Sequence, residues 1–233
     1  MKPILISEIF GPVLQGEGAL VGRPTVFVRT AGCDYRCAWC DSLYAVLPEY
    51  KAEWTAMTAD RVLEQVRNLT KDQPILVTLS GGNPALQPLE PLVDLGQSAG
   101  FSFCMETQGS VCKTWFSKLE HLVLSPKPPS SGMETDWGAL VQCVASGAKN
   151  LSLKVVVFDQ ADYLFAREVH RRFPSVPFYL QAGSDIAASE IEYSKATAER
   201  LNELMARALD DGWRDVTILP QLHVLLWGQK RGV

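Results

Sequence analysis

The chain has 233 residues, 47% of them hydrophobic and 21% charged, which is ordinary for a globular protein and predicts one domain over residues 1–233. Its formal net charge is −4 and it has no basic run beyond Lys230-Arg231, so the electrostatic footprint of a nucleic-acid-binding protein is missing. No apolar stretch approaches the ~20 residues that span a bilayer, and residues 1–5 do not begin a signal peptide, so we expect a cytoplasmic protein without a membrane partner.

Short β-rich runs alternate with longer helical windows along the chain. Strands are expected at 25–29, 75–79, 101–105, 121–124, 151–158 and 178–181, and a last extended run at 216–219. Helices are expected at 58–68, 89–99, 137–145, 159–172 and 190–209, with Thr58 and Asp159 as N-caps of the first and fourth. Helices between strands imply a parallel sheet, and six strands are too few for a closed eight-stranded barrel. The pattern therefore predicts an α/β fold, a partial (β/α)6 TIM-like barrel with a lateral opening.

Two segments are expected to be loops. Residues 42–56 have no clear periodicity and are expected to cover the site or the opening. Residues 9–18 carry three glycines around Gln15 and Glu17, which is typical of a turn. An amide and a carboxylate there could instead bind the donor and acceptor edge of a flat heterocycle. Arg29, at the end of the first strand, could bind a substrate carboxylate or form an ion pair with a neighbouring acid.

Three cysteines follow the first strand with the spacing C-x3-C-x2-C: Cys33, Cys37 and Cys40. Thiolates at this spacing can hold three corners of a [4Fe–4S] cluster and leave one iron open for chemistry. A structural zinc site would need a fourth ligand, and the three histidines are remote in the sequence: His121, His170 and His223. Charged neighbours such as Asp34 and Arg36 argue against a buried apolar segment. The pattern therefore favours an iron–sulfur site.

Further polar motifs follow the next three strands: SGGNP at 80–84, ETQG at 106–109 and SPKPP at 125–129. In parallel α/β folds the loops after the strands build the active site, so these motifs should lie beside the cysteines. Glu106 and Gln108 are expected to reach a cofactor or the substrate. Lys154 lies inside the apolar strand SLKVVVF, where an unpaired charge is costly. It either pairs with a buried carboxylate or faces the site inside the barrel.

The cysteine spacing is that of the radical S-adenosylmethionine (SAM) superfamily, which the chain resembles. The ordered motifs FGPVLQGEG, FVRTAGCDYRCAWCDS, LSGGNPAL, ETQG, SPKPPSS, LKVVVF, FYLQ and LPQLHVLLWGQKRGV resemble the 7-carboxy-7-deazaguanine synthase family over nearly the full length. The resemblance implies a partial barrel of the radical SAM type. It also implies conversion of 6-carboxy-5,6,7,8-tetrahydropterin to 7-carboxy-7-deazaguanine and ammonia by radical ring contraction, on the route to queuosine.

The resemblance also implies cofactors and contacts. The cofactors are a [4Fe–4S] cluster on the three cysteines, S-adenosylmethionine, and Mg²⁺ bound by the hydroxyl of Ser42. The residues implied to bind S-adenosylmethionine are Trp39, Cys40, Asp41, Gly82, Glu106, Ser125, Pro126, Lys127 and Gln181. The residues implied to bind the pterin are Leu14, Gln15, Gly16, Glu17, Arg29, Ser80 and His223. The family usually carries an acidic residue at the position of Asn83, so a cofactor role is carried over to the backbone of Gly82 and not to the Asn83 side chain.

The family likeness further implies an electron donor such as flavodoxin and a homodimer, with Leu225, Leu226 and Trp227 as candidate contacts. Two other functions remain open at this point. A glycyl-radical activase would share the cysteine loop but needs a groove that admits a polypeptide. A non-enzymatic iron–sulfur or zinc module would be recognised by metal analysis.

Overall fold

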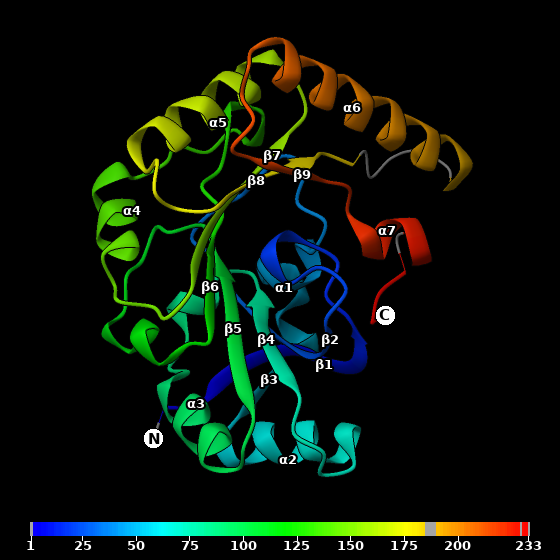
Figure 1. Cartoon of the computed structure of the whole chain (residues 1–233). Coiled ribbons are helices and arrows are strands. Elements are labelled where there is room, and N and C mark those ends of the chain that lie inside the picture. The colour runs from blue at the N-terminus through cyan, green and yellow to red at the C-terminus, as the bar shows by residue number, and fades with distance from the viewer. Residues whose placement is uncertain (1, 185–189, 229, 233) are drawn as a thin grey trace.

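The computed structural model describes residues 2–184, 190–228 and 230–232 (Figure 1). In this part of the chain nine strands form one open, curved sheet in the order β3-β1-β2-β4-β5-β6-β7-β8-β9. The strands are β1 (Ile4–Leu14), β2 (Pro24–Thr30), β3 (Thr55–Met57), β4 (Leu76–Gly81), β5 (Ser102–Thr107), β6 (His121–Leu124), β7 (Leu151–Val157), β8 (Phe178–Ala182) and β9 (Thr217–Leu219).

The expected parallel half-barrel is confirmed. From β2 to β9 every neighbouring pair in the sheet is parallel. Six of these strands match the six expected from the sequence, and β9 matches the last extended run. The sheet stays open because β9 at one edge and the antiparallel pair of β1 and β3 at the other do not meet.

The prediction that residues 9–18 and 42–56 form loops is largely wrong. Most of 9–18 belongs to β1, which pairs with β2 in an antiparallel ladder. Gly11 and Pro12 hide this strand in the sequence, because they lie where the ladder register shifts between Phe10 and Val13. Residues 42–56 contain the helix α1 (Leu43–Val46), a 3₁₀ turn at Pro48–Glu53 and the start of β3. Such short elements are too brief for a periodic pattern.

The remaining helices are α2 (Ala59–Thr70), α3 (Glu90–Ser98), α4 (Trp137–Val144), α5 (Gln160–Arg172), α6 (Glu190–Asp210) and α7 (Leu222–Trp227). The predicted caps are confirmed. The Thr58 hydroxyl accepts the Arg61 N–H at 3.4 Å, and the Asp159 carboxylate accepts the Asp162 N–H at 2.9 Å. None of the helices in the described ranges has both the length and the apolar content that a membrane span requires.

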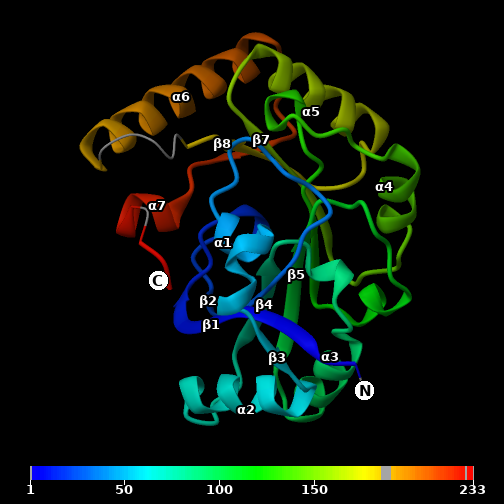
Figure 2. The ribbon, with the colours of Figure 1, turned by 180° about the vertical axis from the view of Figure 1, so that it is seen from behind.

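The two faces of the sheet differ in chemistry. Side chains alternate between the faces along each strand, and the outward ones, such as Val28, Leu79 and Val155, form the main apolar core. The helices α2 to α6 lie along this outer side, whereas α1 and α7 lie at the open side (Figures 1 and 2). The inward face carries polar groups, including Thr78, whose hydroxyl lies 3.2 Å from the thiol of buried Cys104. The core therefore stabilises the sheet from outside and leaves its concave face for a site.

Candidate functional site

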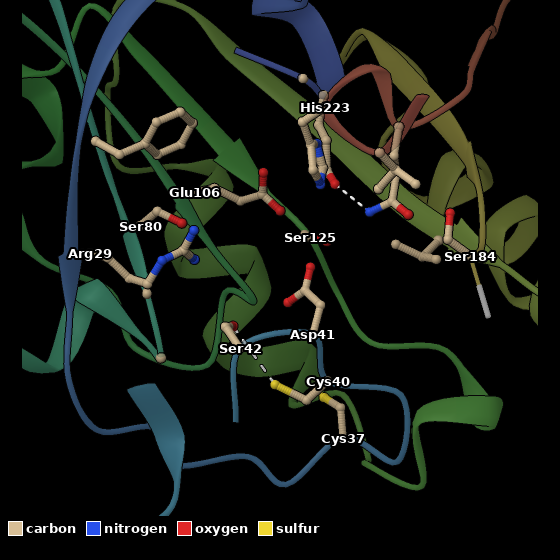
Figure 3. Close-up of a pocket in the computed structure, with 18 of the residues that line it drawn as sticks. Arg29, Cys37, Cys40, Asp41, Ser42, Ser80, Glu106, Ser125, Ser184 and His223 are labelled. Carbon is tan, nitrogen blue, oxygen red and sulfur yellow. Dashed lines mark hydrogen bonds between the residues drawn. The ribbon is translucent and has the colours of Figure 1, made fainter. Parts of the chain in front are cut away.

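The concave face of the sheet and the loops after its strands line one large pocket (Figure 3). Cys37 and Cys40 lie at one side and His223 at the opposite side, and the side chains of Arg29 and Glu106 point into the space between them. All but two of the residues expected to contact metal, cofactor or substrate line this pocket: Leu14, Gln15, Gly16, Glu17, Arg29, Cys33, Cys37, Trp39, Cys40, Asp41, Ser42, Ser80, Gly82, Glu106, Ser125, Lys127 and His223. Pro126 and Gln181 are the two that do not line it.

The cysteine loop packs against the end of β4. The Gly82 N–H donates to the Thr30 carbonyl at 3.1 Å, and the Asn83 N–H donates to the Gly32 carbonyl at 2.8 Å. A Cβ on Gly82 would collide with that Gly32 carbonyl, and Gly81 has a φ of +125° that side chains disfavour. The paired glycines therefore let the two backbones approach each other, which is a structural reason for SGGNP beside any contact with a ligand.

Asp34 in the cysteine loop is held by three side chains from the segments that follow β4 and β5. Its Oδ1 accepts the amide N–H groups of Asn83 at 2.8 Å and Gln108 at 2.6 Å, and its Oδ2 accepts the Ser110 hydroxyl at 2.6 Å. Asn83 is fully buried, and its Oδ1 accepts from the Thr107 hydroxyl and the Ala85 N–H. The Asn83 amide therefore connects the cysteine loop to the end of β5, and its N–H group makes a contact with Asp34 that an ionised acidic residue could not make.

The donor set fits an iron–sulfur cluster. The three thiols are half-buried, and burial raises their pKa, that of Cys37 to about 11, so metal binding would displace protons. Cys33 Sγ accepts from the Tyr35 N–H at 3.4 Å and from Gln108 Nε2 at 3.7 Å, and such hydrogen bonds suit a cluster thiolate. Among the described residues no three His, Cys, Asp or Glu side chains gather around a single point. A cubane does not require that, because each thiolate binds a different iron.

Beside the thiols the pocket wall is aromatic and cationic. Trp39 donates its indole N–H to Ser130 Oγ at 2.9 Å, and Lys127 Nζ lies 5.9 Å from the Trp39 ring centroid. Lys127 Nζ also donates to the carbonyl and hydroxyl of Ser125 at 3.0 and 3.1 Å, which fixes the SPK turn. Nearby, Gln181 Oε1 and Ser184 Oγ are buried without a hydrogen-bond partner among the described residues. Unpartnered buried acceptors of this kind suit a polar cofactor.

The ion-pair alternative for Arg29 is confirmed, and the residue also lines the pocket. Its Nε donates to Glu8 Oε1 at 2.7 Å, and its guanidinium lies within 6 Å of the Phe10 and Tyr44 rings. Glu8 also accepts the Tyr44 hydroxyl at 2.9 Å and Arg231 Nε at 3.0 Å. This arrangement positions the guanidinium of Arg29 in the pocket, where it can bind an anionic group.

A flat apolar surface lies beside Arg29. The Phe10 and Phe27 rings are stacked with centroids 5.1 Å apart and an interplanar angle of 7°, and both line the pocket. Planar rings of this kind are a suitable wall for a flat heterocycle. The surface comes from β1 and β2, which run side by side.

The turn after β1 contacts the last helix. Gly16 accepts the Leu222 N–H through its carbonyl at 2.9 Å, and a Cβ on Gly16 would collide with the His223 ring. Gln221 Nε2 donates to Glu17 Oε1 at 2.6 Å. These contacts place the amide of Gln15, the carboxylate of Glu17 and the imidazole of His223 around one end of the pocket.

Both alternatives for Lys154 also hold. Its side chain is 1% exposed and lines the pocket from β7, and its ammonium group forms ion pairs with Glu17 and Glu106. The other two histidines have structural surroundings, as expected. His170 is buried and accepts the Trp213 indole N–H at 2.7 Å, and His121 lies 2.9 Å from Ser152 Oγ.

Several lining residues were not found from the sequence. Phe10 and Tyr44 lie in segments that were expected to be loops, and Arg231 lies near the C-terminus without a local motif. One signal could have found Phe10, because Phe27 and Arg29, two positions apart, share one face of the next strand, and an aromatic residue on a neighbouring strand can pair with Phe27 on that face. The Arg231 contact has no comparable signal.

Comparison with known proteins gives consistent matches. Residues 27–125 match the radical SAM superfamily. The chain is 43% identical to 7-carboxy-7-deazaguanine synthase of Bacillus subtilis strain 168, covering 100% of this chain and 99% of that protein. It is 41% identical to the Bacillus cereus protein of the same name, covering all of both chains. The crystal structure of QueE from Escherichia coli has the same fold, with a TM-score of 0.70 at 23% identity over 95% of both chains.

Proposed function

This chain belongs to the 7-carboxy-7-deazaguanine synthase family within the radical SAM superfamily, and we propose that it catalyses the reaction of that family. The substrate would be 6-carboxy-5,6,7,8-tetrahydropterin, and the products 7-carboxy-7-deazaguanine and ammonia, on the route to queuosine. The observation that carries this proposal is identity of 43% over the full chain, together with one pocket that contains the three thiols, Arg29 and the Gln15–Glu17 turn. Similarity over the whole length to proteins named as synthases favours this reaction over a glycyl-radical activase.

The cofactors would supply the radical and the chain would position it. When bound, a [4Fe–4S] cluster and S-adenosylmethionine would supply the radical chemistry, the reversible removal of a hydrogen atom from C6 of the pterin. Cys33, Cys37 and Cys40 would hold the cluster. Asp34 and its hydrogen-bond partners would keep the loop in place, and the half-closed barrel would keep water away from reactive species.

The wall beside the cysteines would bind S-adenosylmethionine. Trp39 and Lys127 offer a ring face and a cation, and Ser125 and Gly82 offer backbone groups within the same pocket. Glu106 offers a carboxylate that can accept hydroxyl or amino hydrogens. For Gln181, support comes from its buried and unpartnered Oε1, although the residue does not line the pocket.

The opposite end would bind the pterin. Arg29 would hold the carboxylate, Phe10 and Phe27 would contact the ring, and Gln15 and Glu17 would pair with the polar edge. Magnesium prefers oxygen ligands and retains several waters. Ser42 Oγ would be one ligand of the ion, and the substrate carboxylate would be another.

The assembly, the electron donor and the cellular location are proposed from the likeness to the family. Half-exposed Leu225 and Leu226 on α7 are candidate contacts of a homodimer. A one-electron donor such as flavodoxin would reduce the cluster. Because all six cysteines are free thiols and an iron–sulfur cluster needs reducing conditions, we propose that the enzyme acts in the cytoplasm. We also propose that the chain is one domain.

The test is anaerobic turnover. Protein reconstituted with iron and sulfide is incubated with the carboxypterin, S-adenosylmethionine, Mg²⁺ and dithionite, and the product is identified by mass with ammonia measured in parallel. We expect 7-carboxy-7-deazaguanine from the wild type and none from Cys37→Ala. A cluster-loaded wild type that cleaves S-adenosylmethionine but leaves the pterin unchanged would refute the proposal, and a glycyl radical formed on a partner protein would support the activase instead.

A further inference from the structure

A lysine bridges two carboxylates across the pocket. Lys154 projects from β7 onto the concave face, and its Nζ contacts a carboxylate oxygen of Glu17 and lies 2.6 Å from Glu106 Oε1. The Lys154 side chain is 1% exposed, whereas the side chains of Glu17 and Glu106 are 15% and 27% exposed. The two acids therefore keep surface open to the pocket while the lysine between them has almost none.

The three residues come from distant parts of the chain. Glu17 follows β1 and also accepts from Gln221 beside α7, Glu106 lies near the end of β5, and Lys154 lies in the middle of β7. Glu106 points towards the centre of the pocket (Figure 3). In the proposed function, Glu17 lies on the pterin side and Glu106 on the S-adenosylmethionine side. The ammonium group thus connects the two ligand sites directly.

Packing alone does not account for a lysine at this position. A buried ion pair costs desolvation, and an apolar side chain of similar volume is often as stable or more so. The outward neighbours on the same strand, Leu153 and Val155, are apolar and fully buried. A methionine would fill the volume of Lys154, but it would leave the two carboxylates without a shared cation.

We infer that Lys154 is the positioning residue of the site: it holds Glu17 and Glu106 at a fixed separation as hydrogen-bond acceptors, one for each ligand. This inference rests on the proposed function for the identity of the ligands. Lys154 acts through the two carboxylates and is not itself a catalytic residue.

The charges around the bridge agree with this role. Burial by itself would raise the pKa of Glu17, but the charges of Lys154 and His223 and the hydrogen bond from Gln221 outweigh it and lower that pKa to about 2. Burial would likewise lower the pKa of Lys154, and the two carboxylates raise it instead. The other cations that line the pocket from neighbouring elements are Arg29, Lys127, Lys230 and Arg231. Lys154 is the cation in contact with both acids.

The test compares Lys154→Met with Val155→Ala in the reconstituted holoenzyme. Both variants perturb β7, but Val155 faces the core outside the pocket. Dissociation constants for S-adenosylmethionine and for the carboxypterin are measured from pH 6 to pH 9 and divided by the wild-type values. Without the ammonium group, a buried carboxyl group keeps its proton to higher pH, and in that uncharged form it is a weaker hydrogen-bond acceptor.

For Lys154→Met we expect a ratio of at least tenfold at pH 6 that falls as the pH rises, by up to about tenfold per pH unit for one proton. For Val155→Ala we expect a ratio that does not change with pH, and Lys154→Arg should restore part of the affinity. A ratio for Lys154→Met that is flat with pH, as in Val155→Ala, would overturn the inference. If Lys154→Met does not fold, Lys154→Met/Glu17→Gln replaces it, because this double variant keeps the net charge of the cluster, and S-adenosylmethionine affinity alone is scored.

The two proposals fail separately in this design. If the wild type does not bind or convert the carboxypterin, but Lys154→Met still shows the pH-dependent loss of S-adenosylmethionine affinity, the proposed function fails and the bridge stands. If the wild type makes the product and both variants have flat ratios, the bridge fails alone.

Discussion

Replacing Asn83 with aspartate would test how the cysteine loop is held. The Asn83 amide is fully buried and donates to Asp34 Oδ1 at 2.8 Å and to Ser110 Oγ at 3.1 Å. Aspartate has the same shape but no N–H group, so the variant puts a second carboxylate oxygen where the N–H faced Asp34. The perturbation is therefore almost purely electrostatic.

The cost follows from the distance. Two unit charges 2.8 Å apart repel by about 6 kcal/mol at an effective dielectric constant of about 20, so the pair would rather retain one proton. Holding that proton costs about 1.4 kcal/mol for each pH unit above the ordinary aspartate pKa of about 3.9, which is about 2 kcal/mol at pH 5.5 and about 5 kcal/mol at pH 7.5. The charge of Asp34 raises the pKa of the new carboxyl group in the folded state, so the variant loses stability as the pH rises.

Calorimetric melting of the reconstituted protein measures this difference. About 1 kcal/mol shifts the Tm by roughly 2–4 °C for a chain of this length, so Asn83→Asp should lose about 5–11 °C more at pH 7.5 than at pH 5.5, relative to the wild type. Asn83→Ala removes the same donors without adding a charge, and its deficit should be equal at both pH values. If the two variants have the same pH dependence, repulsion with Asp34 is not the cause and the reasoning is refuted.

The remaining predictions concern the metal sites and the tail. Cys37→Ala removes a thiolate, so no [4Fe–4S] cluster should assemble, as measured by iron content and absorbance. Cys112→Ala, outside the pocket, should retain the cluster. A full iron complement in Cys37→Ala would contradict the assignment. Ser42→Ala leaves the thiols intact, so iron content should equal that of the wild type while Mg²⁺ stimulation of turnover weakens, and full stimulation would exclude Ser42 as a ligand. Arg231→Met breaks the contact with Glu8, and the loss of about 1 kcal/mol should raise the carboxypterin KM about fivefold with little change in kcat; an unchanged KM would contradict the link.

The parallel half of the fold was predictable because its signals are local. Each parallel strand from β2 to β8 is a short apolar run, and two of the helices, α2 and α5, begin at the caps Thr58 and Asp159, whose side chains make the expected hydrogen bonds. Right-handed crossovers then order the strands without further information. The cysteines and the glycine-rich turn fall at one edge for the same reason, so most of the pocket wall beside the cysteines follows from chain order.

The direction of the Lys154 side chain also follows from the sequence, through the alternation of side chains along β7. In β7 the residues Leu153 and Val155 face the core, and side chains alternate, so the residue between them must face the concave side. The identity of its partners was not encoded. Glu17 is 137 positions away in sequence and reaches Lys154 from the turn that follows β1, the strand between β3 and β2 in the sheet.

The missed strand and the missed substrate-side residues are one error. Glu8 lies on β1, and its carboxylate accepts from Arg29 on β2 and from Arg231, which is 223 positions away in sequence. Reading 9–18 as a loop removed the antiparallel neighbour of β2, and with it the reason for any acid to lie beside Arg29. Once β1 is paired with β2, Glu8 lies opposite Arg29 in the ladder and the ion pair follows from that register. The C-terminal segment is then attached through a second cation on Glu8, because Arg231 donates to that carboxylate and lies over the ring of Tyr44. One carboxylate therefore sets both the position of Arg29 in the pocket and the position of the tail beside it, so Glu8→Gln should disturb both together.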